Sequence, residues 1–310
     1  MKTFSIAIHG GAGTLLKGQM TTQKEAAYRS ALQGALDVGY SILANQGNSI
    51  DAVEAAVKVL EDSPLFNAGK GSVFTAEGTH EMDAAIMEGK DLKAGAVSLI
   101  TGIKNPVSLA RDVLEKSEHV FLAGDGAMRF ARDNNYEVVP KAYFYDALRH
   151  QQWQDLKGSN AFQLDHSVKK DSKFGTVGAV ACDAFGNIAA ATSTGGMTNK
   201  KWGRVGDSPM IGAGNYANNN TCAVSCTGSG EFFIRGVVAY DVSCLMEYKG
   251  LPLAEAASEV IQHRVLKLGG DGGLIAVDAK GNVTMPFNTE GMYRGFKKSN
   301  GEDQVLIYKE

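Results

Sequence analysis

The sequence lacks any uninterrupted apolar run near the roughly 20 residues that a membrane-spanning helix needs. Its first nine residues alternate like a strand and are too short for a signal peptide. It also has only four cysteines in 310 residues, with no CxxC pair among them. We therefore expect a cytoplasmic protein with no membrane partner, whose cysteines are small buried side chains instead of disulfides or zinc ligands.

An excess of charge of either sign is missing as well. The 31 Lys and Arg residues nearly balance the 34 Asp and Glu residues, which leaves a net charge of -3. Such a balance provides no field for holding nucleic acid, so a small polar ligand is the expected partner. The six histidines show no HExxH motif and no metal-ligand spacing, and we interpret them as surface or loop residues.

Several familiar catalytic motifs fail on inspection. Gly69-Lys70 has neither the earlier glycine nor the following hydroxyl of a phosphate-binding loop. Residues 206–210 lack the last glycine of a nucleophile elbow, and Ser167-Val168-Lys169-Lys170 matches SxxK without the partner motifs of that enzyme class. The chemistry must therefore be sought elsewhere.

Glycine, in contrast, is abundant. The chain contains 37 glycines, and they gather in short clusters where backbone must approach backbone or ligand closely. The length allows one large domain or two, and composition does not separate these.

Hydrophobic periodicity and turn residues predict a mixed α+β fold. Residues 3–8 predict a strand that ends in the glycine loop 9–13. Helices are expected at 22–47, 48–63, 143–157, 231–249 and 252–268, with short ones after 105 and 126. Strands are expected at 82–100 (a hairpin), 120–123, 176–182, 188–194, 222–226, 275–277, 283–285 and 305–308. Two stacked, mainly antiparallel sheets covered by helix layers, an αββα sandwich, follow from this order.

A polar segment without periodicity, about 158–173, is interpreted as a mobile linker, and Gly175-Thr176 follows it directly. If the chain is cut between Gly175 and Thr176, the threonine presents a hydroxyl and its own α-amino group. That amine has a reference pKa of about 7.7 to 8.0, so it can accept the hydroxyl proton without a histidine base. Gly175 lacks a Cβ and can adopt the strained backbone that self-cleavage requires.

At these residues the sequence resembles the plant-type asparaginase and isoaspartyl aminopeptidase family of N-terminal-nucleophile (Ntn) hydrolases. The resemblance covers nearly the whole chain except the linker. Its motifs are residues 9–13, 65–69, 83–84, 95–97, 175–181, 193–196, 203–209, 211–214 and 227–231.

The resemblance implies a role for each matching residue at the reacting end of the substrate. Thr176 would be the nucleophile, and the Thr194 hydroxyl would support and orient it. Thr227 and Gly228 would form the oxyanion hole through a hydroxyl and a backbone N–H. Asn67 would lie near the nucleophile.

The resemblance also implies a substrate clamp and a structural sodium ion. Arg204 would bind the substrate α-carboxylate, Asp207 its α-ammonium group, and Gly230 would help at the amino end. The sodium ligands would be six backbone carbonyls, those of Leu60, Glu61, Ser63, Phe66, Ala68 and Lys70. Two residues depart from the family pattern: Lys70 replaces a frequently aliphatic residue, and Ser229 a frequent threonine or histidine.

We therefore expect an enzyme that hydrolyses isoaspartyl dipeptides and the side-chain amide of L-asparagine. Residues 1–310 would form a single domain, cut into fragments 1–175 and 176–310 and paired as a dimer of such units. Two alternatives stay open: a glycosylasparaginase-like amidase that acts on sugar-linked asparagine, and a non-catalytic small-molecule binder with a vestigial cleavage site.

Overall fold

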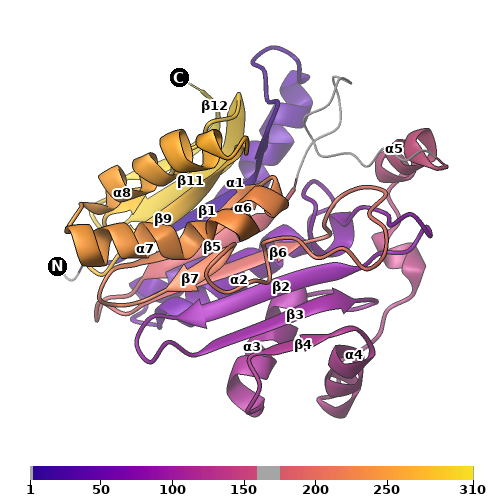
Figure 1. Ribbon diagram of the computed structural model, residues 1–310, viewed down its shortest axis with the longest axis horizontal. Coiled ribbons are helices and arrows are strands. Elements are labelled where there is room, and N and C mark those ends of the chain that lie inside the picture. The colour runs from indigo at the N-terminus through magenta and orange to yellow at the C-terminus, as the bar shows by residue number, and fades with distance from the viewer. Residues whose placement is uncertain (1–2, 159–174, 310) are drawn as a thin grey trace.

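The computed structural model describes residues 3–158 and 175–309. Apart from Gly158, the linker expected at 158–173 lies outside these residues. The described strands form two stacked sheets, one of eight strands and one of four, with helices against the outer face of each (Figure 1). The predicted α+β class with two mainly antiparallel sheets is confirmed.

The large sheet has the strand order β12-β11-β1-β5-β6-β2-β3-β4, and its neighbours are antiparallel except for the parallel pair β3 and β4. In chain order the strands are β1 (Ser5–Gly13), β2 (Met82–Glu88), β3 (Ala94–Ile100), β4 (Phe121–Ala123), β5 (Val177–Cys182), β6 (Ile188–Thr194), β11 (Gly291–Lys298) and β12 (Asp303–Tyr308). The strand that follows Thr176, β5, is therefore interior, between β1 and β6.

The small sheet has the order β10-β9-β8-β7 and is antiparallel throughout. Its strands are β7 (Asn215–Ala217), β8 (Cys222–Gly228), β9 (Gly272–Asp278) and β10 (Val283–Thr284). Side chains alternate between the two faces of a strand. Accordingly Ala223 of β8 packs between the sheets, whereas Cys222 and Val224 pack against the helices.

Helices of the first half of the chain cover the large sheet. They are α1 (Thr22–Ala44), α2 (Ser49–Glu61) and α3 (Pro106–Lys116). The Thr21 side chain caps α1 by accepting from Lys24 N, and Asn48 caps α2 by accepting from Asp51 N. Buried aliphatic side chains such as Leu36, Val57 and Ile8 join these helices to the sheet.

Smaller elements complete this half of the molecule. They are η1 (Gly69–Gly71), α4 (Gly124–Asp133), η2 (Lys141–Phe144) and α5 (Ala147–Leu156). Helix α5 is docked through Trp153, which stacks on Phe74 with ring centroids 5.6 Å apart.

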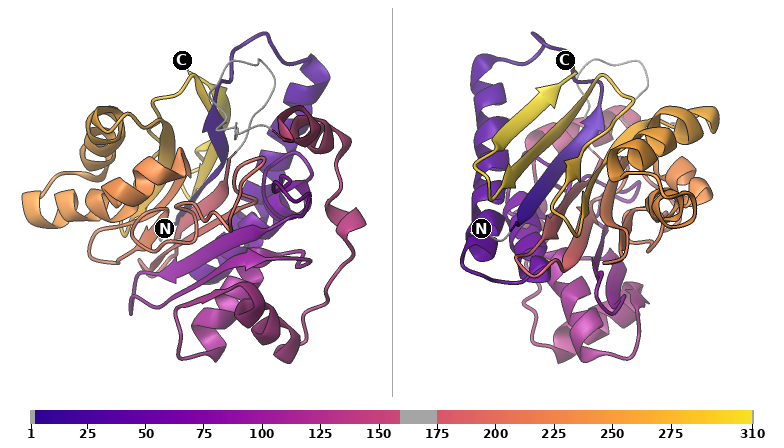
Figure 2. Two further views of the ribbon diagram at one scale, coloured as in Figure 1. Left: turned by 45° about the vertical axis from the view of Figure 1, so that its right-hand side comes forward. Right: turned by 90° about the vertical axis from the view of Figure 1, so that its left-hand side faces the viewer.

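Helices of the second half cover the small sheet. They are α6 (Gly230–Gly236), α7 (Val238–Lys249) and α8 (Leu253–Glu259), which continues into the π-helical segment η3 (Val260–Val265). A second apolar cluster lies between them and the sheet. In the right-hand view of Figure 2 the orange helices α7 and α8 lie on the opposite side of the strands from the indigo α1.

The structure corrects several expected elements. The first strand does not end before the glycine loop: β1 continues to Gly13 because it pairs with β11, with a bulge between His9 and Gly11. Both β11 and β7 were missed. The single helix expected at 231–249 is broken at Val237, and the helix expected from 143 begins only at Ala147.

Two findings concern compartment and membrane. The four cysteines are free, three of them buried and Cys244 partly exposed. In the part of the chain that the structure describes, no helix combines the length and apolar character needed to cross a bilayer.

Candidate active site

Thr176 lies where β5 begins, next to the open end of the space between the two sheets. It is almost fully buried, with 4% of its surface exposed. By strand alternation Thr176, like Gly178, faces the small sheet. An ideal Cβ on Gly175 would meet Thr227 Oγ1 at 3.9 Å, so the end of β8 faces the Gly175-Thr176 peptide.

The carbonyl oxygen of Gly175 accepts two side-chain hydrogen bonds. One donor is the Thr194 hydroxyl, at the end of β6. The other is Asn67 Nδ2, at 3.3 Å. The bond between Gly175 and Thr176 is thus polarised by two donors aimed at its carbonyl.

Both donors are themselves held by backbone groups. Thr194 Oγ1 accepts from Gly196 N at 3.0 Å, so its proton remains for Gly175. Asn67 Nδ2 also donates to the Gly196 carbonyl at 2.7 Å, and Asn67 Oδ1 accepts from Val73 N at 3.0 Å. A side chain at Gly195 would collide with this arrangement, because its Cβ would lie 2.4 Å from Asn67 Oδ1.

The Thr176 hydroxyl itself contacts Ser208. The two hydroxyl oxygens are 3.2 Å apart, and Ser208 is 1% exposed. The sequence predicts no role for Ser208. Ser208 follows Asp207 in the loop 203–209, and only the fold shows that this loop contacts Thr176.

The Thr176 carbonyl contacts His9, at the bulge of β1. His9 Nδ1 lies 3.2 Å from the Thr176 oxygen, and the ring is fully buried. Burial lowers the pKa of His9 to about 3, so the ring is neutral. The interpretation of the histidines as surface or loop residues is wrong for His9, which lies inside β1. His80 does lie in a loop, but with only 6% of its surface exposed.

Thr227 and Gly228 lie at the end of β8, which faces the Gly175-Thr176 peptide. Thr227 is fully buried, and its Oγ1 accepts from Ala12 N at 3.3 Å. Since that bond uses the oxygen as an acceptor, the hydroxyl proton is free to be donated. Gly228 has no room for a side chain, because a Cβ would lie 2.4 Å from the carbonyl oxygen of Asp271.

Arg204, Asp207 and Gly230 meet in one place. An ideal Cβ on Gly230 would lie 2.8 Å from Asp207 Oδ1 and 3.0 Å from Arg204 Nη2. Arg204 makes a bidentate contact with Glu231, whose oxygens accept from Nε at 2.8 Å and from Nη2 at 2.9 Å. The geometry shows that this guanidinium can hold a carboxylate with both arms.

Asp207 is the more unusual member of this group. It is 3% exposed, and its Oδ2 has no hydrogen-bond partner among the described residues. Burial raises the pKa of this carboxyl to about 7, although the Arg204 guanidinium acts in the opposite direction. A buried carboxylate with an unused oxygen is suited to receive an ammonium group.

The expected sodium ligands extend from the end of α2, through the loop that carries Asn67, to η1. Carbonyl oxygens crowd its glycines: a Cβ on Gly69 would lie 2.4 Å from Glu61 O, and one on Gly71 would lie 2.0 Å from Phe66 O. The Lys70 ammonium points over the Tyr143 ring, 5.5 Å from its centroid. Among the described residues no cluster of three or more His, Cys, Asp or Glu side chains could hold a metal ion.

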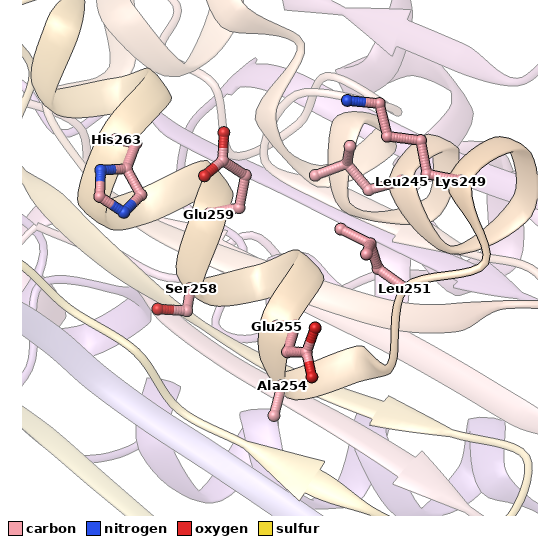
Figure 3. A pocket seen from close by; sticks show the side chains of 8 residues that line it. All are labelled: Leu245, Lys249, Leu251, Ala254, Glu255, Ser258, Glu259 and His263. Carbon is pink, nitrogen blue, oxygen red and sulfur yellow. The ribbon is translucent and has the colours of Figure 1, made fainter.

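One surface cavity is lined by other elements. It has a volume of ≈ 580 Å³ and is formed by α7, the turn that follows it, α8 and η3, with Leu245, Leu251, Glu255 and His263 in its wall (Figure 3). None of the residues assigned to the site lines it.

Known proteins resemble this chain over nearly its whole length. The profile of a family described as asparaginase matches residues 1–307. An isoaspartyl peptidase of Escherichia coli is 51% identical over 308 residues, which cover 98% of this chain and 96% of the relative. An isoaspartyl peptidase/L-asparaginase of Mus musculus is 44% identical (93% and 86% covered), and a plant-type L-asparaginase of Pyrococcus abyssi is 42% identical (95% and 96%).

Proposed function

The chain belongs to the asparaginase family, and from this membership and the site we propose that it is a threonine-dependent amidohydrolase. Its substrates are isoaspartyl dipeptides and the side-chain amide of L-asparagine, as the names of its relatives indicate for those proteins. The observation that carries the proposal is the Gly175 carbonyl, which two side-chain donors hold beside the Thr176 hydroxyl.

The first reaction is the cut that creates the nucleophile. The Thr176 hydroxyl oxygen attacks the Gly175 carbonyl carbon, and the negative charge on the carbonyl oxygen is stabilised by Thr194 and Asn67. The Thr176 nitrogen takes the proton that the hydroxyl loses, the C–N bond breaks, and an ester on Thr176 with a free amine remains. Water hydrolyses this ester, which gives a Gly175 carboxylate and the mature amino terminus. Fragments 1–175 and 176–310 remain folded together as one Ntn-hydrolase domain.

The second reaction uses the same hydroxyl. The new α-amino group accepts the hydroxyl proton as Thr176 attacks the β-carbonyl of the substrate. The oxyanion receives the free Thr227 proton and the Gly228 N–H. Ammonia or an amino acid leaves with a proton from the ammonium group of Thr176. Water activated by the regenerated amine then releases aspartate from the β-aspartyl ester.

The clamp orients the aspartyl part of the substrate. Arg204 binds the α-carboxylate with the two arms that Glu231 occupies in the free protein. Asp207 meets the α-ammonium group with its unused oxygen, and Gly230 leaves the room that this requires. Two opposite charges at fixed positions select an α-amino acid.

A sodium ion fits the loop that holds Asn67. The carbonyls of Leu60, Glu61, Ser63, Phe66, Ala68 and Lys70 are hard oxygen donors, and two of them crowd the glycine turn at 69–71. When bound, the ion would neutralise the negative ends of these carbonyl dipoles. Lys70 does not oppose it, because its ammonium lies over Tyr143. We assign the ion a structural role, outside the reaction.

Two mature domains would associate as an (αβ)2 dimer in a reducing cytoplasm, where the four free thiols of the chain stay unpaired.

The substrate test uses the purified, incubated protein with three amides: β-aspartyl-leucine, L-asparagine and asparagine linked to a sugar. We expect aspartate from the first two, measured by an enzyme-coupled assay. Turnover of only the sugar-linked amide would identify the glycosylasparaginase-like alternative. Binding of aspartate without turnover of any of the three would identify a non-catalytic binder.

A further inference from the structure

Four buried polar side chains form a line between the two sheets, beneath Thr176. They are His9 of β1, Ser225 of β8, Thr192 of β6 and Asn215 of β7, each fully buried. The space around them is otherwise filled by apolar side chains such as Ala7, Val180 and Ile275. Because buried polar groups are costly unless they are hydrogen-bonded, this line, here called the polar relay, requires a reason.

The contacts are continuous. His9 Nε2 lies 2.9 Å from Ser225 Oγ, and Ser225 Oγ lies 2.7 Å from Thr192 Oγ1. Asn215 Nδ2 donates to Thr192 Oγ1 at 3.0 Å. At the other end His9 Nδ1 lies 3.2 Å from the Thr176 carbonyl.

The proton order follows from donor capacity. A carbonyl can only accept, so His9 Nδ1 carries the single proton of the neutral ring and donates it to Thr176. His9 Nε2 is then an acceptor and receives the Ser225 proton. Thr192 Oγ1 has two acceptors within reach, Ser225 Oγ at 2.7 Å and the Gly214 carbonyl at 3.3 Å, and the shorter contact assigns its proton to Ser225. The hydroxyls thus fix one tautomer of His9, the one that binds Thr176.

Gly178 makes the relay possible. It pairs with His9 on one side and with Thr192 on the other, so its position lies in the path of the contacts. An ideal Cβ there would lie 2.0 Å from Ser225 Oγ and 2.5 Å from His9 Nε2. The second glycine of Gly175-Thr176-Val177-Gly178 is therefore explained by the imidazole that passes beneath it.

Cutting changes what holds Thr176. In the uncut chain, Thr194 and Asn67 hold it indirectly through the Gly175 carbonyl. After the cut that carbonyl belongs to another fragment. The hydroxyl contact with Ser208 and the carbonyl contact with His9 remain.

We propose that His9 is a positioning residue that, locked in its Nδ1–H tautomer by Ser225 and Thr192, holds the carbonyl of the mature N-terminal threonine and thereby aims its hydroxyl. The role rests on the proposed function of Thr176 and extends it to a residue that touches neither substrate nor reacting atoms.

Two variants separate the two ring nitrogens. In His9→Asn the amide nitrogen can take the place of Nδ1 and keep the donor to Thr176. In His9→Gln the amide reaches the place of Nε2 and keeps only the Ser225 contact. Both leave a similar void. We expect kcat for asparagine to fall about 10- to 100-fold in H9Q, with KM within about twofold, and H9N to recover most of it. Equal kcat values in H9N and H9Q overturn the proposal.

Two further measurements work even if a variant is cut slowly or turnover is absent. The rate of cutting should follow the same order, H9N faster than H9Q, and equal rates contradict the positioning role. The ¹⁵N shifts of the wild-type ring, assigned by their loss in H9N, should show a protonated Nδ1 and a bare Nε2. A protonated Nε2 and a bare Nδ1 would contradict the proposed tautomer of His9.

The relay has a matched control. Ser225→Ala removes the lock, whereas Ser243→Ala removes an equally buried hydroxyl that pairs with Thr221 at 2.7 Å, away from Thr176. We expect similar losses of stability but a fall in kcat only in S225A. A wild-type protein that turns over no aspartyl amide refutes the proposed function. Equal kcat in S225A and S243A, with an active wild type, refutes only the relay.

Discussion

At the scale of single residues, side chains hold two backbone carbonyls: that of Gly175, just before the Thr176 nitrogen, and that of Thr176 itself. Thr194 and Asn67 hold the Gly175 carbonyl, and His9 holds that of Thr176. The sequence could indicate the hydroxyl and charged residues, because their types fit the chemistry and their motifs resemble a family. It could not indicate His9 or Ser208. Their roles depend on contacts with Thr176, which lies 167 residues from His9 and 32 residues from Ser208 along the chain.

The buried Asp207 carboxylate should lower the free energy of unfolding at high pH, and it should bind the substrate ammonium group. Burial raises its pKa to about 7 from an ordinary value of 3.8. Its favourable contribution is therefore complete below pH 3.8 and is lost as pH rises through about 7. We expect Asp207→Asn, measured by urea unfolding in an uncut T176A background, to be more stable than its parent at pH 8 by up to about 4 kcal/mol.

The difference should shrink toward zero at pH 4, where both side chains are neutral. In the cleavable background the same change should reduce kcat/KM by at least about 30-fold, because the substrate ammonium loses its partner. A variant that is less stable than its parent at pH 8, or a difference that does not depend on pH, contradicts the assignment of the raised pKa.

At the scale of elements, the break between α6 and α7 lets the start of α7 hold the segment that follows Asp207. The first turn of α7 donates Ala239 N to Ala213 O at 3.1 Å and Tyr240 N to Gly212 O at 2.8 Å. These carbonyls lie just beyond the loop that carries Asp207. The periodicity of 231–249 predicts one continuous helix. Nothing in the local sequence indicates that the backbone N–H groups at the start of α7 are needed as donors to residues 212 and 213.

The residue at the break, Val237, has a left-handed backbone conformation, with φ 48° and ψ 46°. A β-branched side chain is strained in that region, so Val237→Gly should stabilise the protein by about 1 kcal/mol. The neighbouring Val238→Gly is the control: it removes a buried side chain from a helix and should destabilise the protein by more than 1 kcal/mol. Urea midpoints measure both, and a V237G midpoint below wild type contradicts the strain.

Strand β11 shows why part of the fold escaped prediction. Its residues, Gly291 to Lys298, contain two glycines and three charges and do not resemble an interior strand. They form one because β1 pairs along them, and the glycine-rich end of β1 stays extended for the same reason. Strands that are continuously apolar or small in sequence and bounded by a clear turn, such as β5 and β6, were predicted within one residue. A strand that forms only because it pairs with a distant segment could not be predicted from its own sequence.

At the scale of the whole molecule, the site is assembled from segments throughout the chain. Residues 9, 67, 176, 194, 204–208 and 227–231 meet where the two sheets end, although they are up to 222 positions apart. Stacked sheets with helix layers outside were predictable from the pattern, because sheets buried on both faces must be covered. The account also requires both halves of the chain to remain folded together after the cut, since each half contributes to the site.

The central claim is that Thr176 first cuts the chain and then hydrolyses the substrate. Intact-mass spectrometry of the incubated protein tests it, with Thr176→Ala and Thr176→Ser in parallel and asparagine hydrolysis assayed on the same samples. We expect the wild type to give fragments 1–175 and 176–310 and to release aspartate. T176S should be cut, because it keeps a hydroxyl, and T176A should stay at 32.9 kDa without activity. Cutting and asparagine hydrolysis that persist in T176A would contradict the account.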